Sequence, residues 1–196
     1  LSLFGCGATD NALPPTPLQD FKASLTLHTD WVTDVGSPDP QVSAPVVWGN
    51  AVYAAGSFGQ LSRVDAKTGV IRWNAQTKGS ISSGVASDGE HVLVGTTKGM
   101  VFSFSSQGKM LWQSMVSSEV LSTPTIDGES VLVRSGDGRV HALNLADGVR
   151  KWEYQATTPS LILRSSPAVA RLGQLALVGL PGGKLVALDS ATGNLR

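Results

Sequence analysis

The sequence predicts an all-β protein with the architecture of a β-propeller, in which four-stranded antiparallel sheets, called blades, are arranged around an axis. Two observations carry this prediction: a pattern of about forty residues recurs along the chain, and its complete copies end in tryptophan. The composition agrees, because 22 glycines and only 15% charged residues indicate many short strands joined by turns. The formal net charge is zero, so no basic surface indicates nucleic acid as a partner.

Each copy of the repeat starts at a glycine and has Asp, Ser or Asn six residues later. The opening glycines are 40, 39 and 45 residues apart, which is the length expected of one four-stranded blade. They are Gly59, Gly99, Gly138 and Gly183, the polar residues are Asp65, Ser105, Asn144 and Asp189, and the closing tryptophans are Trp73, Trp112 and Trp152. The fourth copy reaches Arg196, after which a tryptophan is expected.

Four short strands are expected in each repeat. In the third repeat they are predicted over 122–126, 130–135, 139–143 and 150–154, with Asp-Gly or similar dipeptides at the turns, where tight hairpins need positive φ. The polar residue at the end of the third strand can accept hydrogen bonds from N–H groups of the following turn. The tryptophan is large enough to pack against the neighbouring blade, and stacked blades bury both faces of each sheet. A β-sandwich with coincidental spacing is the alternative interpretation.

The repeat divides the chain into blades at about 41–77, 80–117, 119–157 and 158–196. Before them, residues 24–36 with Trp31 are predicted to form a leading strand that resembles the fourth strand of a blade. Closed propellers use such a strand to complete their last blade, which here would lie beyond Arg196. We therefore expect the N-terminal half of an eight-bladed ring, at the upper end of the usual range of about four to eight blades.

The N-terminal residues resemble the end of a bacterial lipoprotein signal. In Leu3-Phe4-Gly5-Cys6 an apolar stretch ends in a small residue before a cysteine, so residues 1–6 are interpreted as a signal remnant with lipidation at Cys6. The first residue is not Met, so we expect a further segment upstream. Residues 7–23 contain three prolines and are predicted to be a flexible tether. A buried or unmodified thiol is the alternative for Cys6, which has no second cysteine to pair with.

The pattern Asp-x-x-x-Gly-x-x-x-Trp resembles that of pyrroloquinoline-quinone-type propellers, whereas the signatures of WD40 propellers are absent. A lipidated cysteine, a short tether, a leading strand and blades of this type together resemble the BamB family. These are lipoprotein subunits of the outer-membrane β-barrel assembly machinery, and the resemblance covers nearly the whole chain. It implies a scaffold without enzymatic activity or cofactor, anchored by lipid at the periplasmic face of the outer membrane of a Gram-negative bacterium. The implied partners are a POTRA domain of BamA and unfolded outer-membrane proteins.

The fourth repeat is longer than the others, and the excess lies within 156–166. In the BamB family a loop resembling Pro-Ser-Leu-x-Leu-Arg docks on BamA, and the matching stretch here runs from Pro159 to Arg164. The resemblance implies that Leu161 and Leu163 are apolar anchors and that Arg164 is a polar anchor. Two leucines at alternate positions can point to one side of an extended segment, beside a directional donor. The alternative is an innermost strand with both leucines in the core.

Quinoprotein dehydrogenases are the enzymatic alternative, because they share this repeat. They need a quinone cofactor, Ca²⁺ held by carboxylate and amide oxygens, and an aspartate base. No Ser/His/Asp set, phosphate loop or paired carboxylates stand out, and the histidines His28, His91 and His141 lack ligand spacing. The aspartates fall mainly at predicted turns, which favours a structural role for Asp65, Asp88, Asp127, Asp137, Asp147 and Asp189. We expect the chain to continue beyond Arg196, and residues there could supply such a site, so the enzymatic alternative stays open. A propeller sensor domain is a third class, which the N-terminal position of the signal disfavours.

Overall fold

The computed structural model describes residues 16–19, 24–37, 44–155 and 167–196. The chain divides into two compact units, Leu1–Asp30 and Trp31–Arg196. The described residues of the first unit are exposed and form neither helix nor strand.

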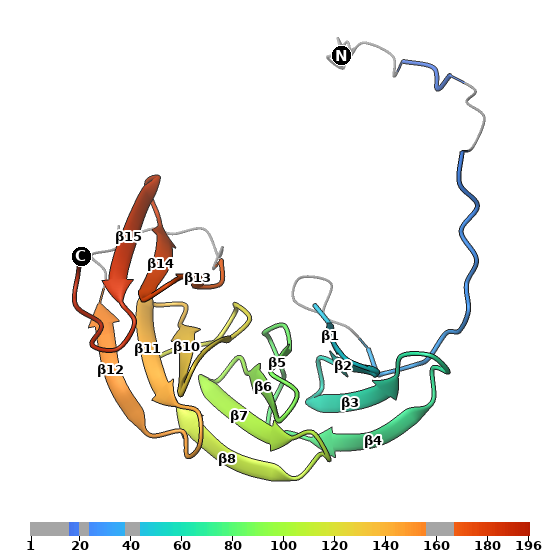
Figure 1. Ribbon diagram of the computed structural model, residues 1–196, viewed down its shortest axis with the longest axis horizontal. Helices are drawn as coiled ribbons and strands as arrows, with labels where there is room; N and C mark the ends of the chain where they lie inside the picture. The colour runs from blue at the N-terminus through green and yellow to red at the C-terminus, as the bar shows by residue number, and fades with distance from the viewer. Residues whose placement is uncertain (1–15, 20–23, 38–43, 156–166) are drawn as a thin grey trace, which may run out of the picture. The chain divides into compact units, whose positions relative to one another are not determined.

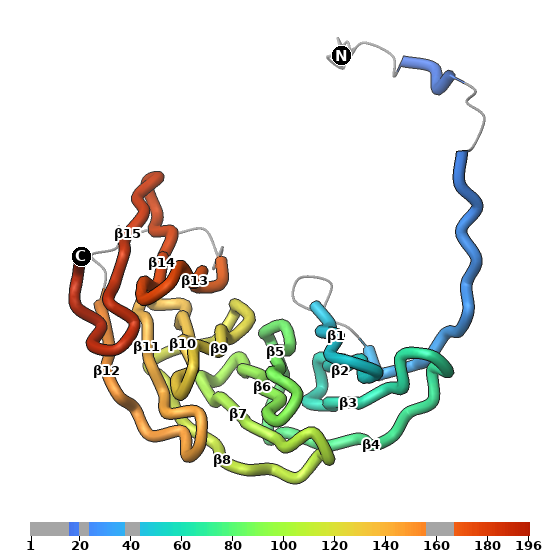
Figure 2. The backbone as a smooth tube through the Cα atoms, in the orientation of Figure 1, coloured from blue at the N-terminus to red at the C-terminus, as the bar shows by residue number. Residues whose placement is uncertain are grey.

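The second unit consists of four antiparallel sheets, which confirms the predicted all-β fold with about four blades (Figures 1 and 2). Its described residues form no helix. In each sheet the strands follow one another in chain order, as in a meander. The strands are β1 (Val46–Trp48), β2 (Ala51–Ala55), β3 (Gln60–Asp65) and β4 (Ile71–Gln76); β5 (Ala86–Ser87), β6 (His91–Gly95), β7 (Met100–Ser105) and β8 (Met110–Met115); β9 (Thr125–Asp127), β10 (Ser130–Arg134), β11 (Arg139–Asn144) and β12 (Arg150–Gln155); and β13 (Ala170–Leu172), β14 (Leu175–Leu180) and β15 (Lys184–Asp189).

The four sheets lie side by side as blades of an arc. The first strand of each blade, β1, β5, β9 and β13, lies on the inside of the arc, and β4, β8 and β12 lie on the outside (Figures 1 and 2). Successive inner strands contact one another. In the fourth blade, residues after β15 return as an isolated bridge between Leu188 and Leu195. This is the start of the fourth strand that the repeat predicts.

Most predicted strand limits in the third blade agree with β9 to β12 within one or two residues. The exception is the first strand, which begins at Thr125 and not at residue 122. Pro124 precedes it and has no N–H group to donate to a ladder. The Ser122 hydroxyl is buried and bonds the Arg134 carbonyl, so this segment is held by a side chain in place of strand pairing.

The hydrophobic core lies between blades and not within them. Tyr53 of the first blade packs in one cluster with Phe102 of the second. A second cluster joins the second and third blades, and a third cluster joins the third and fourth. In β10 all residues are buried, and alternate side chains belong to different clusters. Because each fully buried aliphatic side chain contributes about 1.5–3 kcal/mol, a blade depends on both of its neighbours for stability.

The tryptophans pack against the neighbouring blade, as predicted. The indole of Trp112 in β8 lies on the turn after β11, where its Nε1 donates to the Leu145 carbonyl at 2.7 Å. A Cβ atom on Gly148 in that turn would lie 2.5 Å from the ring, so only glycine fits beneath it. Trp73 makes the same contact with Ser106 and Gly108 of the second blade, and Trp152 makes it with Ser190 and Gly193 of the fourth.

A β-bulge precedes each of these tryptophans. The pairing of the third and fourth strands shifts by one residue at the same place in three blades, which leaves Arg72, Leu111 and Lys151 as the extra residues. Each extra residue comes directly before the tryptophan. Since a bulge bends a strand and re-aims its side chains, we attribute the orientation of the indole toward the next blade to this bulge.

Trp31 makes the same contact with the first blade, although no blade precedes it in the described residues. Its Nε1 donates to the Ala66 carbonyl at 3.0 Å, and a Cβ atom on Gly69 would lie 2.7 Å from its ring. The Thr33 hydroxyl also donates to the Gly69 carbonyl. Residues 24–37 form no strand in the structure. The position of Trp31 is that of a fourth-strand tryptophan, and the leading strand itself stays a prediction.

Two glycine substitutions separate the cost of the indole contact from that of backbone strain. Gly148 and Gly128 both have positive φ, of 75° and 57°, but no atom lies within 4 Å of a Cβ placed on Gly128. Gly128→Ala should cost about 1–2 kcal/mol from conformation alone. Gly148→Ala should cost clearly more, because its methyl group would collide with Trp112. Urea unfolding of both variants measures this difference, and equal losses would contradict the proposed role of the contact.

Candidate functional site

The residues that the sequence analysis assigns to partner binding lie outside the described residues. Leu161, Leu163 and Arg164 belong to 156–166, and Cys6 belongs to 1–15. The described residues that border this segment are Gln155, the last residue of β12, and Pro167. The candidate sites that can be built from described residues are the turn carboxylates, a buried histidine cluster and one cavity.

The aspartate that ends the third strand of a blade organises the following turn, as predicted. Asp65 Oδ1 accepts hydrogen bonds from the N–H groups of Lys67 and Thr68, each at 3.1 Å, and from the Thr68 hydroxyl. Its Oδ2 accepts from Arg72 at 2.8 Å. The Arg72 guanidinium holds the pKa of the Asp65 carboxyl far below its usual range. Asn50 Nδ2 also donates to Oδ2, at 2.9 Å. A carboxylate that accepts from five donors has a structural role in its turn and is not a general base.

Asp189 repeats this arrangement in the fourth blade. Its Oδ1 accepts from the Ala191 and Thr192 N–H groups, and its Oδ2 accepts from Arg196 at 2.7 Å. The hydrogen bond from Arg196 lowers the pKa of Asp189 to about 2. Ser105 and Asn144 occupy the same position in the other two blades and also accept turn N–H groups.

Structural partners are also found for the aspartates Asp88, Asp127 and Asp147. Asp88 Oδ1 accepts from the Glu90 and His91 N–H groups at 2.9 and 2.7 Å, and Asp147 accepts from the Val149 N–H group. Asp127 differs from the turn role predicted for it, because its carboxylate pairs with Arg171 of the next blade at 2.6 Å. The sequence did not reveal this pair because its members lie on different blades.

A serine, histidine and carboxylate cluster surrounds His141, although no such set was apparent from the sequence. The hydroxyls of Ser117 and Ser135 each lie 3.1 Å from Nε2, and Glu153 Oε2 lies 3.4 Å from Nδ1. The Ser135 hydroxyl also donates to Asp137 at 2.5 Å. Ser117 lies in the connection between the second and third blades, so only folding brings it to the histidine.

The His141 cluster is structural in character. The histidine is 0% exposed, so no substrate atom can reach its ring in this conformation. Burial lowers the pKa of His141, against the opposing effects of the Glu153 and Asp137 charges. Its hydrogen bonds fasten the connection after β8 to strands β10 and β11. His141 is therefore a buried residue of β11 with a role in packing.

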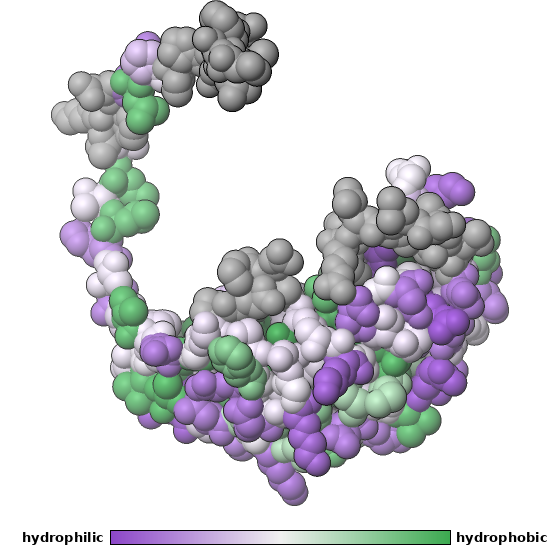
Figure 3. All heavy atoms as spheres, turned by 180° about the vertical axis from the view of Figure 1, so that it is seen from behind, coloured by the Kyte–Doolittle hydropathy of each residue, from purple (hydrophilic) through white to green (hydrophobic). Residues whose placement is uncertain are grey.

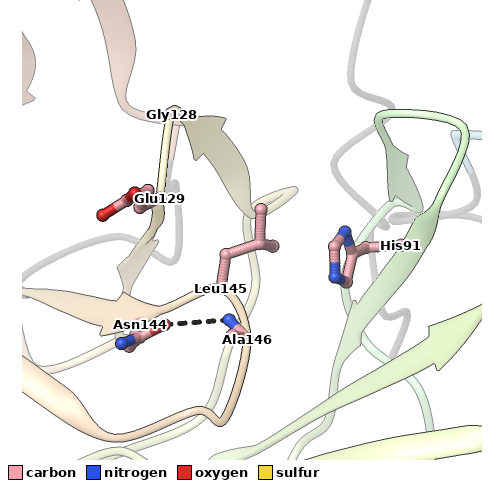
Figure 4. A pocket seen from close by; sticks show the side chains of 6 residues that line it. All are labelled: His91, Gly128, Glu129, Asn144, Leu145 and Ala146. Carbon is pink, nitrogen blue, oxygen red and sulfur yellow. Dashed lines mark hydrogen bonds between the residues drawn. The ribbon is translucent and has the colours of Figure 1, made fainter.

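A cavity of about 350 Å³ lies between the second and third blades (Figure 4). His91, at the start of β6, faces Leu145 across it, and the Glu129 side chain points away from His91. The His91 ring is held by Asp88, whose Oδ2 lies 3.0 Å from Nδ1. The other lining residues are Gly128, Asn144 and Ala146. Sequence reasoning missed this cavity because two turns of one blade and a strand of another form it.

Neither a metal site nor a membrane-spanning helix is found in the described part of the chain. No group of three or more His, Cys, Asp or Glu residues there could hold a metal ion. No helix there is both long and apolar enough to cross a membrane. Polar and apolar residues are mixed over the face of the blades that Figure 3 presents.

A family model described as outer membrane protein assembly factor BamB matches residues 57–196. The chain belongs to the BamB family. BamB of Bordetella pertussis is 36% identical over 199 residues, which cover 100% of this chain and 52% of that protein. BamB of Burkholderia pseudomallei is 40% identical over 190 residues, covering 96% and 50%.

Solved structures agree on the fold. The crystal structure of BamB from Moraxella catarrhalis matches with a TM-score of 0.71 and 24% identity, over 81% of this chain and 48% of that one. A quinohemoprotein alcohol dehydrogenase from Comamonas testosteroni matches with a TM-score of 0.70 and 18% identity, over 85% and 36%. At such identities the likeness shows the propeller fold alone. The chain spans about half the length of the curated BamB relatives it matches.

The described residues contain no group of three or more His, Cys, Asp or Glu at which a dehydrogenase-type site could hold Ca²⁺. Such a site needs a cluster of carboxylate and amide oxygens around Ca²⁺, and the described residues offer no such cluster of acidic ligands. Asp65 and Asp189 bind turn N–H groups and arginines with both carboxylate oxygens. The dehydrogenase structure shares the propeller fold with this chain at 18% identity.

The buried His141 should make stability depend on pH. Because its pKa is lowered from 6.5 in the folded protein, the unfolded chain binds the proton more readily. The full stability is therefore present above pH 6.5 and is lost as the pH falls toward the lowered pKa, by up to about 1.4 kcal/mol per pH unit. His141→Gln removes this titration and keeps a group that can bond the serines. Urea unfolding should show the parent losing stability relative to the variant below pH 6.5, and parallel curves would refute this.

Proposed function

We propose that this chain is part of a scaffold lipoprotein that assists the assembly of β-barrel proteins into the outer membrane, without enzymatic activity of its own. The observation that carries the proposal is the match of the BamB family model over 57–196, together with relatives named as outer membrane protein assembly factors. The structural roles of the described carboxylates and of His141 support it, because they leave these groups committed to turns and to packing.

The first partner in this proposal is a POTRA domain of BamA, bound through Leu161, Leu163 and Arg164. The resemblance of 159–164 to the BamA-binding loop of the family supports this assignment, as does the alternation of the two leucines. Arginine is enriched among the residues that contribute most to protein interfaces, and two leucines beside it add apolar area that binding can bury. The second partner class is unfolded outer-membrane proteins.

The blades that flank this segment are suited to present it. Trp152 of the third blade bonds the Ser190 carbonyl of the fourth blade at 3.0 Å, and Arg134 donates to the Gly179 carbonyl at 2.7 Å. The third hydrophobic cluster fills the space between the same two blades. Because the two blades are joined by several contacts, the described residues Gln155 and Pro167 are held by a common scaffold. A binding segment supported by rigid elements loses less conformational entropy when it binds.

The proposed anchor is a lipid on Cys6, which would place the propeller at the periplasmic face of the outer membrane. Residues 7–23 would act as a tether between the anchor and the blades. One acyl chain gives only marginal membrane binding, so stable attachment would need several chains on one cysteine.

Replacing Leu161, Leu163 and Arg164 together by Ala should abolish co-purification of the full-length protein with BamA. The thermal unfolding midpoint should stay close to that of the parent, because the change removes an interface and not a core. The matched control is Val70→Ala, Val149→Ala and Arg150→Ala, which removes two exposed aliphatic side chains and one exposed arginine elsewhere. BamA binding that survives the first triple change, or is lost equally with the control, would refute the assigned site.

Lipidation can be tested by mass spectrometry of the mature protein from a Gram-negative host. The parent should carry the additional mass of acyl groups, and Cys6→Ser should lack it and be released from membranes. Equal masses, after allowance for the single atom exchanged, would disprove the anchor.

A further inference from the structure

The turns after the first and third strands of each blade lie on one face of the propeller, here called the turn face. On this face the described blades meet at three interfaces, here called seams. The residue that comes before the glycine of the first turn has a different partner at each seam. In the first blade this residue is Trp48, in the second Asp88, and in the third Asp127.

Two of the three seams are closed by side chains of the protein itself. At the first seam Trp48 lies over Gly89 of the second blade, where an added Cβ atom would be 2.2 Å from the indole Nε1. At the third seam Asp127 pairs with Arg171 of the fourth blade at 2.6 Å. An aromatic ring and an ion pair thus occupy equivalent places.

The middle seam is open. Asp88 turns back into its own hairpin, where it accepts the Glu90 and His91 N–H groups and contacts the His91 ring. No atom lies within 4 Å of a Cβ placed on Gly128, the counterpart of Gly89 in the next blade. Gly173 of the fourth blade is equally open, but at that seam the ion pair of Asp127 and Arg171 spans the two blades. The cavity of about 350 Å³ lies at the middle seam. It exists because the second blade has an inward-turned aspartate where the first blade has a tryptophan.

The lining of the cavity suits a planar aromatic ring. The imidazole of His91 faces the aliphatic side chain of Leu145 across the cavity, and the Glu129 side chain points away from His91 (Figure 4). Gly128 and Ala146 add little bulk. The walls are rigid, since Asp88 fixes His91 and the Leu145 carbonyl accepts from Trp112. Its volume of about 350 Å³ lies near the lower end of the range for small-ligand pockets, about 300–1,000 Å³, and leaves space for an aromatic side chain.

We propose that this cavity binds an aromatic side chain from an extended segment of an unfolded outer-membrane β-barrel protein. The bound ring would take the place that Trp48 takes at the first seam. This inference rests on the proposed function and adds to it a substrate-binding site. Membrane β-barrel strands carry aromatic residues at both membrane interfaces, next to alternating apolar residues. An extended client strand would therefore offer the ring that the middle seam lacks.

The test uses the full-length protein and two peptides of about ten residues that alternate Thr with apolar residues. One peptide has a central Trp, and the other has Leu at that position. The Trp peptide should shift the NMR signals of the His91 ring and of the Gly128 amide. It should bind at least about tenfold more tightly than the Leu peptide.

Two variants fill the cavity from the protein side. Asp88→Trp copies the first seam, and Ala146→Phe fills the space without removing a hydrogen-bonding side chain. Either should weaken binding of the Trp peptide by about tenfold or more, whereas Asp88→Asn, which keeps the cavity open, should not. Trp48→Ala should open a second site of the same kind and raise the stoichiometry toward two peptides. Thermal unfolding checks that each variant is folded.

Equal binding of the Trp and Leu peptides, or full binding to folded Ala146→Phe, would overturn the inference. The proposed function is tested separately by the loss of BamA on changing Leu161, Leu163 and Arg164. If BamA binding responds as expected and the peptides do not discriminate, only the cavity assignment fails. If BamA binding does not respond but the Trp peptide binds selectively, the partner assignment fails and the aromatic site remains.

Discussion

The contact between a tryptophan of one blade and a glycine turn of the next is the interaction on which the rest of the structure depends. A single four-stranded blade has two apolar faces, and neither can be satisfied within one sheet. The indole covers one edge of that interface, and its N–H group bonds a backbone carbonyl that would otherwise lose its water. Trp73, Trp112 and Trp152 each do this, and Trp31 presents the same group to the first blade. The contact is directional, from each tryptophan to the blade that follows it in the chain.

Several local features support this contact. The bulge before each tryptophan turns the ring toward its neighbour, and the turn beneath it is kept in shape by the polar residue that ends the third strand. In the first blade that residue is Asp65, which receives the turn N–H groups and the Arg72 guanidinium. The Asp, Gly and Trp of the repeat thus act together. The aspartate shapes a turn, the glycine leaves space above that turn, and the tryptophan of the preceding blade packs into the space. Their spacing in the sequence follows from the length of a hairpin and a blade.

All three seams share the contact between a tryptophan and a glycine turn, but they differ in the side chains that lie between the blades on the turn face. There Trp48 closes the first seam, Arg171 and Asp127 close the third, and the middle seam keeps a cavity. Because the packing of the blades is already secured elsewhere, these positions are free to vary without loss of the fold. The His141 cluster contains the residue types of a catalytic group, but it is fully buried. Its hydrogen bonds hold the connection between the second and third blades in place. Residue types alone do not distinguish a catalytic cluster from a structural one, whereas the exposure of the side chains does.

The sequence by itself determined the all-β class, the presence of about four blades in this chain, most strand limits and the role of the tryptophans, because each depends on a local pattern that recurs in phase. It also placed most aspartates in turns, since turn chemistry acts over a few residues. The first strand of the third blade was predicted too long, because pairing beside Pro124 depends on a donor that the pattern did not weigh. Only the tertiary structure decided which residues meet across a seam. Asp127 with Arg171, Ser117 with His141, and His91 with Leu145 lie on different blades or connections, and their distances follow from how the blades stack and not from any spacing along the chain.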